Sequence, residues 1–131
     1  AMQSAHQPIH DHLIFRHLHT YRDGRHLAEQ ILKMDKSERP DAIFTGSDEV
    51  ACGLISALSA EGVSIPGELA VLGFDNLPIA EMIPIPLTTI SQPIEQLGRI
   101  SVERLLAMIN HAQYRYDEED LQSELIVRAS A

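Results

Sequence analysis

The chain of 131 residues has little of several residue types on which common protein functions depend. Its one cysteine, Cys52, excludes an intramolecular disulfide and a four-cysteine zinc site. It has no tryptophan, and aromatic residues make up 5% of the chain, which disfavours binding of single-stranded nucleic acid by stacking. Lysine and arginine total 10 against 19 acidic residues, and this shortage of cations disfavours binding of nucleic acid by the chain itself.

Long apolar segments are also missing. No apolar run approaches the roughly 20 residues that cross a bilayer, and the N-terminus lacks the basic-then-apolar pattern of a signal peptide. We therefore expect no membrane partner and a cytoplasmic location. With 44% hydrophobic residues and a formal net charge of −9, the sequence suits a small acidic globular unit of one domain or slightly less.

Short apolar segments alternate with segments of helical periodicity. The pattern predicts strands over residues 13–18, 42–45, 69–74, 87–91 and 123–128. It predicts helices from 23 to about 38, from 48 to Gly62, and from an N1 proline at Pro93 to about Asn110. Such alternation with short connections predicts an α/β fold, a parallel sheet flanked by helices. The strand over 42–45 is apolar enough to be buried on both faces.

Two carboxylates follow predicted strands directly. Asp48 comes after the second strand and Asp75 after the third. Ligands of parallel sheets bind beyond the carboxyl ends of the strands, so these positions predict a polar ligand site. The alternative is local, because aspartate at a turn or helix start also bonds to nearby backbone N–H groups.

Four sequence blocks between residues 40 and 130 form a recognisable series. They read Pro-Asp-Ala-Ile-Phe at 40–44 with Ser-Asp-Glu-Val-Ala-Cys-Gly at 47–53, Val-Leu-Gly-Phe-Asp-Asn at 71–76, Pro-Leu-Thr-Thr-Ile at 86–90 with Gln92, and Glu-Leu-Ile-Val-Arg-Ala-Ser at 124–130. In this order the blocks resemble those of LacI/GalR-type transcriptional regulators. Residues 1–38 fit that pattern more loosely.

The resemblance implies that residues 1–131 are the C-terminal lobe of a two-lobed effector-binding domain of the periplasmic-binding-protein-like type I fold. The helix-turn-helix DNA-binding domain of such regulators is absent from the chain, so DNA would be contacted through that domain alone. The implied partners are a small effector, a sugar or nucleoside-like compound, and a second copy in a homodimer. Neither a cofactor nor an enzymatic activity is implied.

The resemblance also implies six ligand-binding residues. Asp75 would accept hydrogen bonds from ligand hydroxyls, Phe74 would form an apolar wall, and Gln92 would reach the cleft from the crossover between lobes. The other three are Ser47, where many members have asparagine, Asp48 and Tyr21. His19 competes with Tyr21 for the aromatic position, and helix capping competes with ligand contact at Ser47 and Asp48.

Two apolar surfaces complete the expectations from the resemblance. The first is a subunit interface formed by Ala51, Cys52, Ile55 and Ile83, with a purely structural burial of Cys52 as the alternative. The second is the apolar stripe of residues 93–110, which would pack on the missing N-terminal lobe. Without that lobe, we expect this helix either to pair with its copy in another chain or to fold back onto its own lobe. We favour pairing between copies, because the faces of its own lobe should already be occupied.

Three other functions compete with a regulator. The histidine pairs His10/His12 and His17/His19 could each project two rings to one side of a strand, but no carboxylate or cysteine cluster accompanies them, so we predict no metal site. A lobe of a periplasmic sugar-binding protein would share the fold. A small hydrolase could use Asp48 and Asp75 as an acid/base pair, although no nucleophile or phosphate loop is evident.

Overall fold

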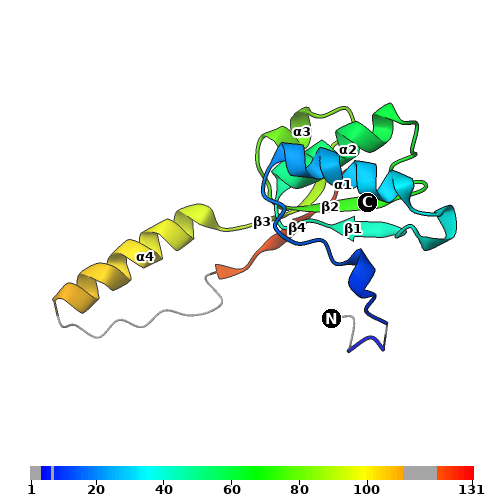
Figure 1. The fold of residues 1–131 in the computed structure, drawn as a ribbon. Helices are drawn as coiled ribbons and strands as arrows, with labels where there is room; N and C mark the ends of the chain where they lie inside the picture. Colours follow the sequence, from blue (N-terminus) through cyan, green and yellow to red (C-terminus); the bar gives the residue numbers. More distant parts are fainter. Residues whose placement is uncertain (1–3, 7, 111–120) are drawn as a thin grey trace.

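The computed structural model describes residues 4–6, 8–110 and 121–131 and has one mixed sheet at its centre (Figure 1). The strand order is β1 (Ala42–Phe44), β2 (Ala70–Asp75), β3 (Thr88–Ser91) and β4 (Glu124–Ile126). β1, β2 and β3 run parallel, in a register that pairs Phe44 with Leu72 and Phe74 with Ile90. The predicted α/β fold is confirmed, but β4 pairs antiparallel with β3.

Local sequence signals place the helices, but the first one ends at Lys33 and not at about residue 38 as predicted, because Met34 is extended and a separate 3₁₀ turn covers Lys36–Glu38. The helices are α1 (Tyr21–Lys33), α2 (Asp48–Ala60), the short α3 (Ile79–Met82) and α4 (Ile94–Ile109). Thr20 and Asp23 form a capping box at the start of α1, and Ser47 caps α2. Gly62 follows α2 with φ 81°, as expected of a glycine after a helix. Pro93 is the N-cap of α4 and not its first helical residue, one position away from the prediction.

The predicted strand over residues 13–18 is wrong. A 3₁₀ turn covers Asp11–Leu13, the following residues pair with no strand, and His17 has a left-handed φ of 61°. Phe15 and Leu18 instead pack against the core as partly buried side chains. A short apolar run predicts burial, and burial alone does not provide the partner strand that a ladder requires.

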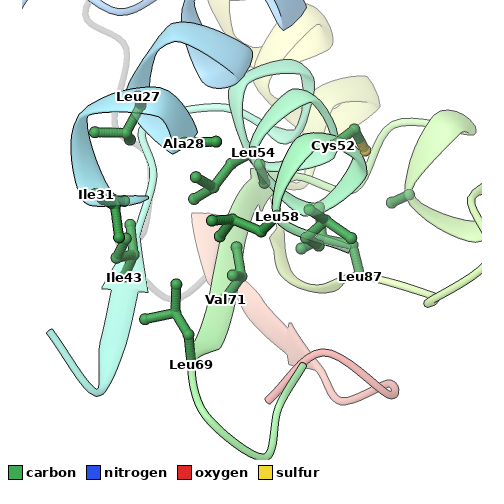
Figure 2. Close-up of a cluster of buried hydrophobic side chains, with 13 residues drawn as sticks. Leu27, Ala28, Ile31, Ile43, Cys52, Leu54, Leu58, Leu69, Val71 and Leu87 are labelled. Carbon is green, nitrogen blue, oxygen red and sulfur yellow. The ribbon is translucent and has the colours of Figure 1, made fainter. Parts of the chain in front are cut away.

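The core lies between α1, α2 and one face of the sheet (Figure 2). The two helices approach closely where glycines face the partner backbone. A Cβ on Gly24 would collide with the carbonyl of Val50, and one on Gly53 would collide with the carbonyl of Tyr21. The largest fully buried apolar side chains are Leu27, Ile31, Val50, Cys52, Leu54, Leu58, Val71 and Leu87.

The other face of the sheet is largely uncovered within the described residues. In Figure 1, α1, α2 and α3 lie on one side of the sheet, and α4 projects away from it. Phe44 is 59% exposed and Leu125 is 55% exposed on this open side, where Phe44 contacts Phe74 edge to face. Burial of β1 on both faces was therefore a wrong prediction, since its one buried residue is Ile43.

The helix α4 extends away from the lobe, so the prediction that it folds back is wrong (Figure 1). Ile100 is its one buried residue, and most of its large apolar side chains are more than 40% exposed. These exposed side chains are Ile94, Leu97, Val102, Leu105, Leu106, Met108 and Ile109. Pairing of α4 with a second copy stays a prediction. None of the described helices has the length and apolar character to span a membrane.

Candidate functional site

Asp48 lies at the carboxyl edge of the sheet, as predicted, but it is fully buried. Its Oδ2 accepts a hydrogen bond of 2.7 Å from the backbone N–H of Leu77, and its Oδ1 accepts one of 2.5 Å from the Thr89 hydroxyl. The first turn of α2 is thus tied to the loop after β2 and to β3. Because both carboxylate oxygens are occupied and no surface is exposed, Asp48 positions the site from inside.

Gly73 makes room for this buried carboxylate. A Cβ at position 73 would collide with Asp48 Oδ1 and would lie 2.7 Å from Leu87 Cδ2. The Gly-Phe-Asp sequence at 73–75 therefore has a direct structural reason. The absence of a side chain at Gly73 leaves space for the Asp48 carboxylate beside β2. Phe74 and Asp75, the next two residues, form the carboxyl end of the strand.

Asp75 ends β2 in an unusual backbone conformation. Its φ is 108° and that of Asn76 is 55°, so two consecutive non-glycine residues lie in the left-handed region. Such conformations cost free energy and persist where neighbouring contacts hold them, often at ligand sites. The Asp75 side chain is partly exposed, and its Oδ1 accepts a hydrogen bond of 2.8 Å from Gln92 Nε2. The structure thus brings together two of the six predicted ligand residues.

Ser47, Phe74 and Tyr21 lie around this edge with different exposures. Ser47 is partly exposed, and its hydroxyl accepts a hydrogen bond of 3.4 Å from the Val50 N–H, so the capping interpretation holds for it. Phe74 is partly buried on the open face of the sheet. Tyr21 is 37% exposed, and its backbone carbonyl lies against Gly53 of α2.

Asn76 and Arg128 belong to the same region and were not predicted from the sequence. Arg128 Nη2 donates a hydrogen bond of 2.9 Å to Asn76 Oδ1 and one of 2.6 Å to Glu81 Oε1. Arg128 Nη1 donates to the backbone carbonyl of Leu87 at 2.9 Å. The arginine in the closing sequence block at 124–130 could have indicated this role, since a lone arginine that follows an apolar segment and becomes largely buried needs acceptors.

A groove lies beside the predicted site and not on it. Its volume is about 480 Å³, and it runs between residues 13–18 and β1. Phe44, Thr45 and Gly46 line its end nearest to the start of α2. None of the six predicted ligand residues lines it. The groove arises because the segment over 13–18 does not pair with the edge of β1.

Three of the four predicted interface residues lie inside the lobe. Ala51 and Cys52 are fully buried and Ile55 is 2% exposed, so none of them offers a surface to a second subunit in this conformation. Burial, together with a smaller effect of the nearby carboxylates Asp48 and Glu49, raises the pKa of the Cys52 thiol to about 11. The thiol is therefore neutral at pH 7 and unsuited to nucleophilic attack. Ile83, the fourth residue, is partly buried.

The arrangement does not favour the two chemical alternatives. The carboxylate of Asp48 is buried and engaged by its two donors, which leaves it out of reach of a substrate as a member of an acid/base pair. The rings of His10 and His12 lie 5.6 Å apart. Across the described residues, no three histidine, cysteine or acidic side chains converge on a point that could hold a metal ion.

Comparisons with known proteins agree on one family. The family described as "periplasmic binding protein-like domain" matches residues 2–131. The HTH-type transcriptional repressor PurR of Vibrio parahaemolyticus is 36% identical over 102 residues, which are 78% of this chain and 30% of that protein. The ribose operon repressor of Haemophilus influenzae is 35% identical over 97 residues, 74% of this chain and 29% of that protein.

A solved structure agrees with this relation. The LacI family transcriptional regulator from Lactobacillus casei, crystallised with bound glucose, matches with a TM-score of 0.85 and 35% identity. The match covers 99% of this chain and 46% of that protein. The chain thus spans about a third of the length of the curated relatives and slightly less than half of this structural neighbour.

Proposed function

Because the chain belongs to the periplasmic-binding-protein-like domain family of LacI-type regulators, we propose that it is one effector-binding lobe of such a regulator. In this proposal the lobe binds a small ligand at the carboxyl edge of its sheet and performs no catalysis. DNA is contacted by a separate helix-turn-helix domain, and the protein acts in the cytoplasm. Ligand binding changes how the lobe closes on its partner lobe, which shifts the population of the DNA-binding state.

The single observation that carries the proposal is the geometry of Asp75. Its partly exposed carboxylate stands at the end of β2 in a left-handed backbone conformation, with Gln92 donating to one oxygen. The other oxygen, Oδ2, is left for a donor from a ligand. A carboxylate that accepts hydrogen bonds suits a ligand with hydroxyl groups, and a sugar is the class we favour. The neighbour from Lactobacillus casei with bound glucose supports this class.

The exposed apolar side of α4 fits a second lobe of the regulator. The helix begins at Ile94, soon after β3 ends at Ser91, and projects away from the sheet (Figure 1). Its exposed residues, among them Leu97 and Leu105, would gain roughly 1.5–3 kcal/mol each from full burial. We therefore assign α4 to the neighbouring lobe, which the chain enters after the crossover at Gln92.

Replacement of the ligand carboxylate tests the proposal directly. Asp75→Ala is expected to weaken binding of a sugar probe about 10- to 100-fold, because a hydrogen bond to a charged group contributes about 1.5–3 kcal/mol. Binding of glucose, ribose and inosine to the chain can be followed by NMR titration at millimolar concentrations. The matched control Asp41→Ala removes an exposed carboxylate before β1 and is expected to leave binding unchanged. Unchanged probe binding by Asp75→Ala, combined with a lower Tm, would leave Asp75 as a turn residue and remove the proposed site.

We also propose a homodimer, with α3 as its centre in place of the buried face of α2. Met82 is 80% exposed on α3 and adjoins Ile83. Met82→Glu is expected to shift sedimentation at micromolar protein from dimer to monomer with little change in Tm. Ile55→Glu should instead unfold the lobe, because it places a charge in the core. A monomeric but fully folded Ile55→Glu protein, or a dimer unaffected by Met82→Glu, would contradict this assignment.

A further inference from the structure

The side chain of Arg128 joins three segments that are far apart in the sequence. Its guanidinium donates to the Leu87 carbonyl before β3, to the Asn76 side chain after β2, and to Glu81 of α3. The Arg128 side chain is 13% exposed, whereas that of Glu81 is 70% exposed. Such a pair at the surface contributes little by charge alone. The planar guanidinium holds its N–H donors in fixed directions, and this geometry fixes the relative positions of the three acceptors.

The backbone around Arg128 is held independently of its side chain. Its N–H donates to Thr88 Oγ1 at 2.9 Å. Two residues later, the buried Ser130 hydroxyl donates to the Val71 carbonyl at 2.6 Å and accepts from the Thr88 N–H at 2.8 Å. The last residues of the chain therefore join the starts of β2 and β3, and they present Arg128 from a fixed base.

Asn76 receives its shortest described hydrogen bond from this arginine. The bond from Arg128 measures 2.9 Å, whereas Asn76 reaches Thr89 and Ser91 at 3.4 Å each. Asn76 directly follows Asp75, and both residues occupy the left-handed region. The conformation of this pair sets where the Asp75 carboxylate points. Two charge-assisted bonds hold this turn: the N–H of Leu77 donates to the buried Asp48 carboxylate, and Arg128 donates to the side chain of Asn76 itself.

We propose that Arg128 is a positioning residue for the ligand carboxylate, acting through Asn76 on Asp75. The inference rests on the proposed function, because that function makes Asp75 a ligand residue. The effect of Arg128 on the conformation of Asn76 and Asp75 can be tested without any ligand. Arg128 keeps Asn76 in place, the left-handed pair keeps its conformation, and Asp75 stays within reach of Gln92.

Two variants separate the Asn76 contact from the ion pair with Glu81. Arg128→Met keeps the aliphatic part of the side chain but loses the hydrogen bonds to all three acceptors. Glu81→Gln removes the ion pair and leaves the bond from Arg128 to Asn76. In the full chain, Arg128→Met is expected to speed amide hydrogen exchange at Asn76 and Leu77 at least ~10-fold and to shift the side-chain NH₂ resonances of Gln92. Glu81→Gln is expected to leave these signals unchanged.

A second pair of variants acts on the acceptor and covers the case in which Arg128→Met does not fold. Asn76→Ala is expected to reproduce the changes at Leu77 and Gln92, while Asn76→Asp, which keeps an oxygen acceptor and tolerates a left-handed φ, should restore them. Unchanged Leu77 and Gln92 signals in Arg128→Met, or an Asn76→Asp protein that behaves like Asn76→Ala, would overturn the proposal. Because no ligand enters this experiment, a failure of the Asp75→Ala binding test would leave its result standing.

Discussion

Asp48→Ala is expected to lower the free energy of unfolding by about 3–4 kcal/mol, because it removes both hydrogen bonds of a fully buried carboxylate at once. The backbone N–H of Leu77 and the Thr89 hydroxyl lose their acceptor within the lobe. Thermal and urea unfolding of the chain measure the effect. For a domain of this size, we expect Tm to fall by about 10 °C.

Glu49→Ala is the matched control, because Glu49 is the exposed second acid in the first turn of α2. Its loss removes a favourable interaction with the helix dipole of about 0.3–1 kcal/mol and no buried bond. If the two variants lower Tm equally, Asp48 is a helix-start acid and does not tether the loop of residues 75–77. A large loss for Asp48→Ala alone supports its role inside the site.

Gly53→Ala is expected to destabilise the lobe by about 3 kcal/mol, because its methyl group would meet the backbone of the neighbouring helix. The added Cβ would collide with the Tyr21 carbonyl oxygen and would lie 2.8 Å from the Tyr21 carbonyl carbon. A backbone cannot move aside as a side-chain tip can, so α1 and α2 must separate. Urea unfolding monitored by circular dichroism measures the loss.

Gly98→Ala provides the opposite expectation on another helix. Gly98 lies in α4, and among the described residues beyond its own helical turn no heavy atom lies within 4 Å of the place that a methyl group would take. Alanine therefore gains helix propensity without a collision. We expect the free energy of helix formation in α4 to improve by about 0.5–1 kcal/mol. Thermal melting of the helical circular dichroism signal measures the gain. A Gly53→Ala protein as stable as the wild type would show that the close approach of α1 and α2 is not needed for the fold.

Local sequence patterns determined most of the secondary structure. Amphipathic spacing with Thr20, Ser47 and Gly62 at the ends marks α1 and α2, and short apolar runs mark β1, β2 and β3. These signals come from neighbours within a few residues, so they can be read without the fold. The same rules failed at residues 13–18, where a strand needs a partner strand that the sequence window does not contain.

The sequence also determined that Asp48 and Asp75 share one edge of the sheet, since both follow parallel strands. The tertiary structure decided their different roles. Asp48 is buried because Leu77 and Thr89, 29 and 41 residues away in the chain, come to its two oxygens. Asp75 stays partly exposed because its backbone turns left-handed.

The apolar faces show the same division most clearly. The sequence by itself determined that α2 and α4 each carry apolar side chains, but it did not determine what covers them. Cys52 and Ile55 are covered by the chain's own core, whereas Leu97 and Leu105 are exposed. Helical periodicity shows that a face is apolar. Whether that face is buried depends on which surfaces the folded chain brings against it. Only the tertiary structure therefore distinguishes a core face from an exposed one.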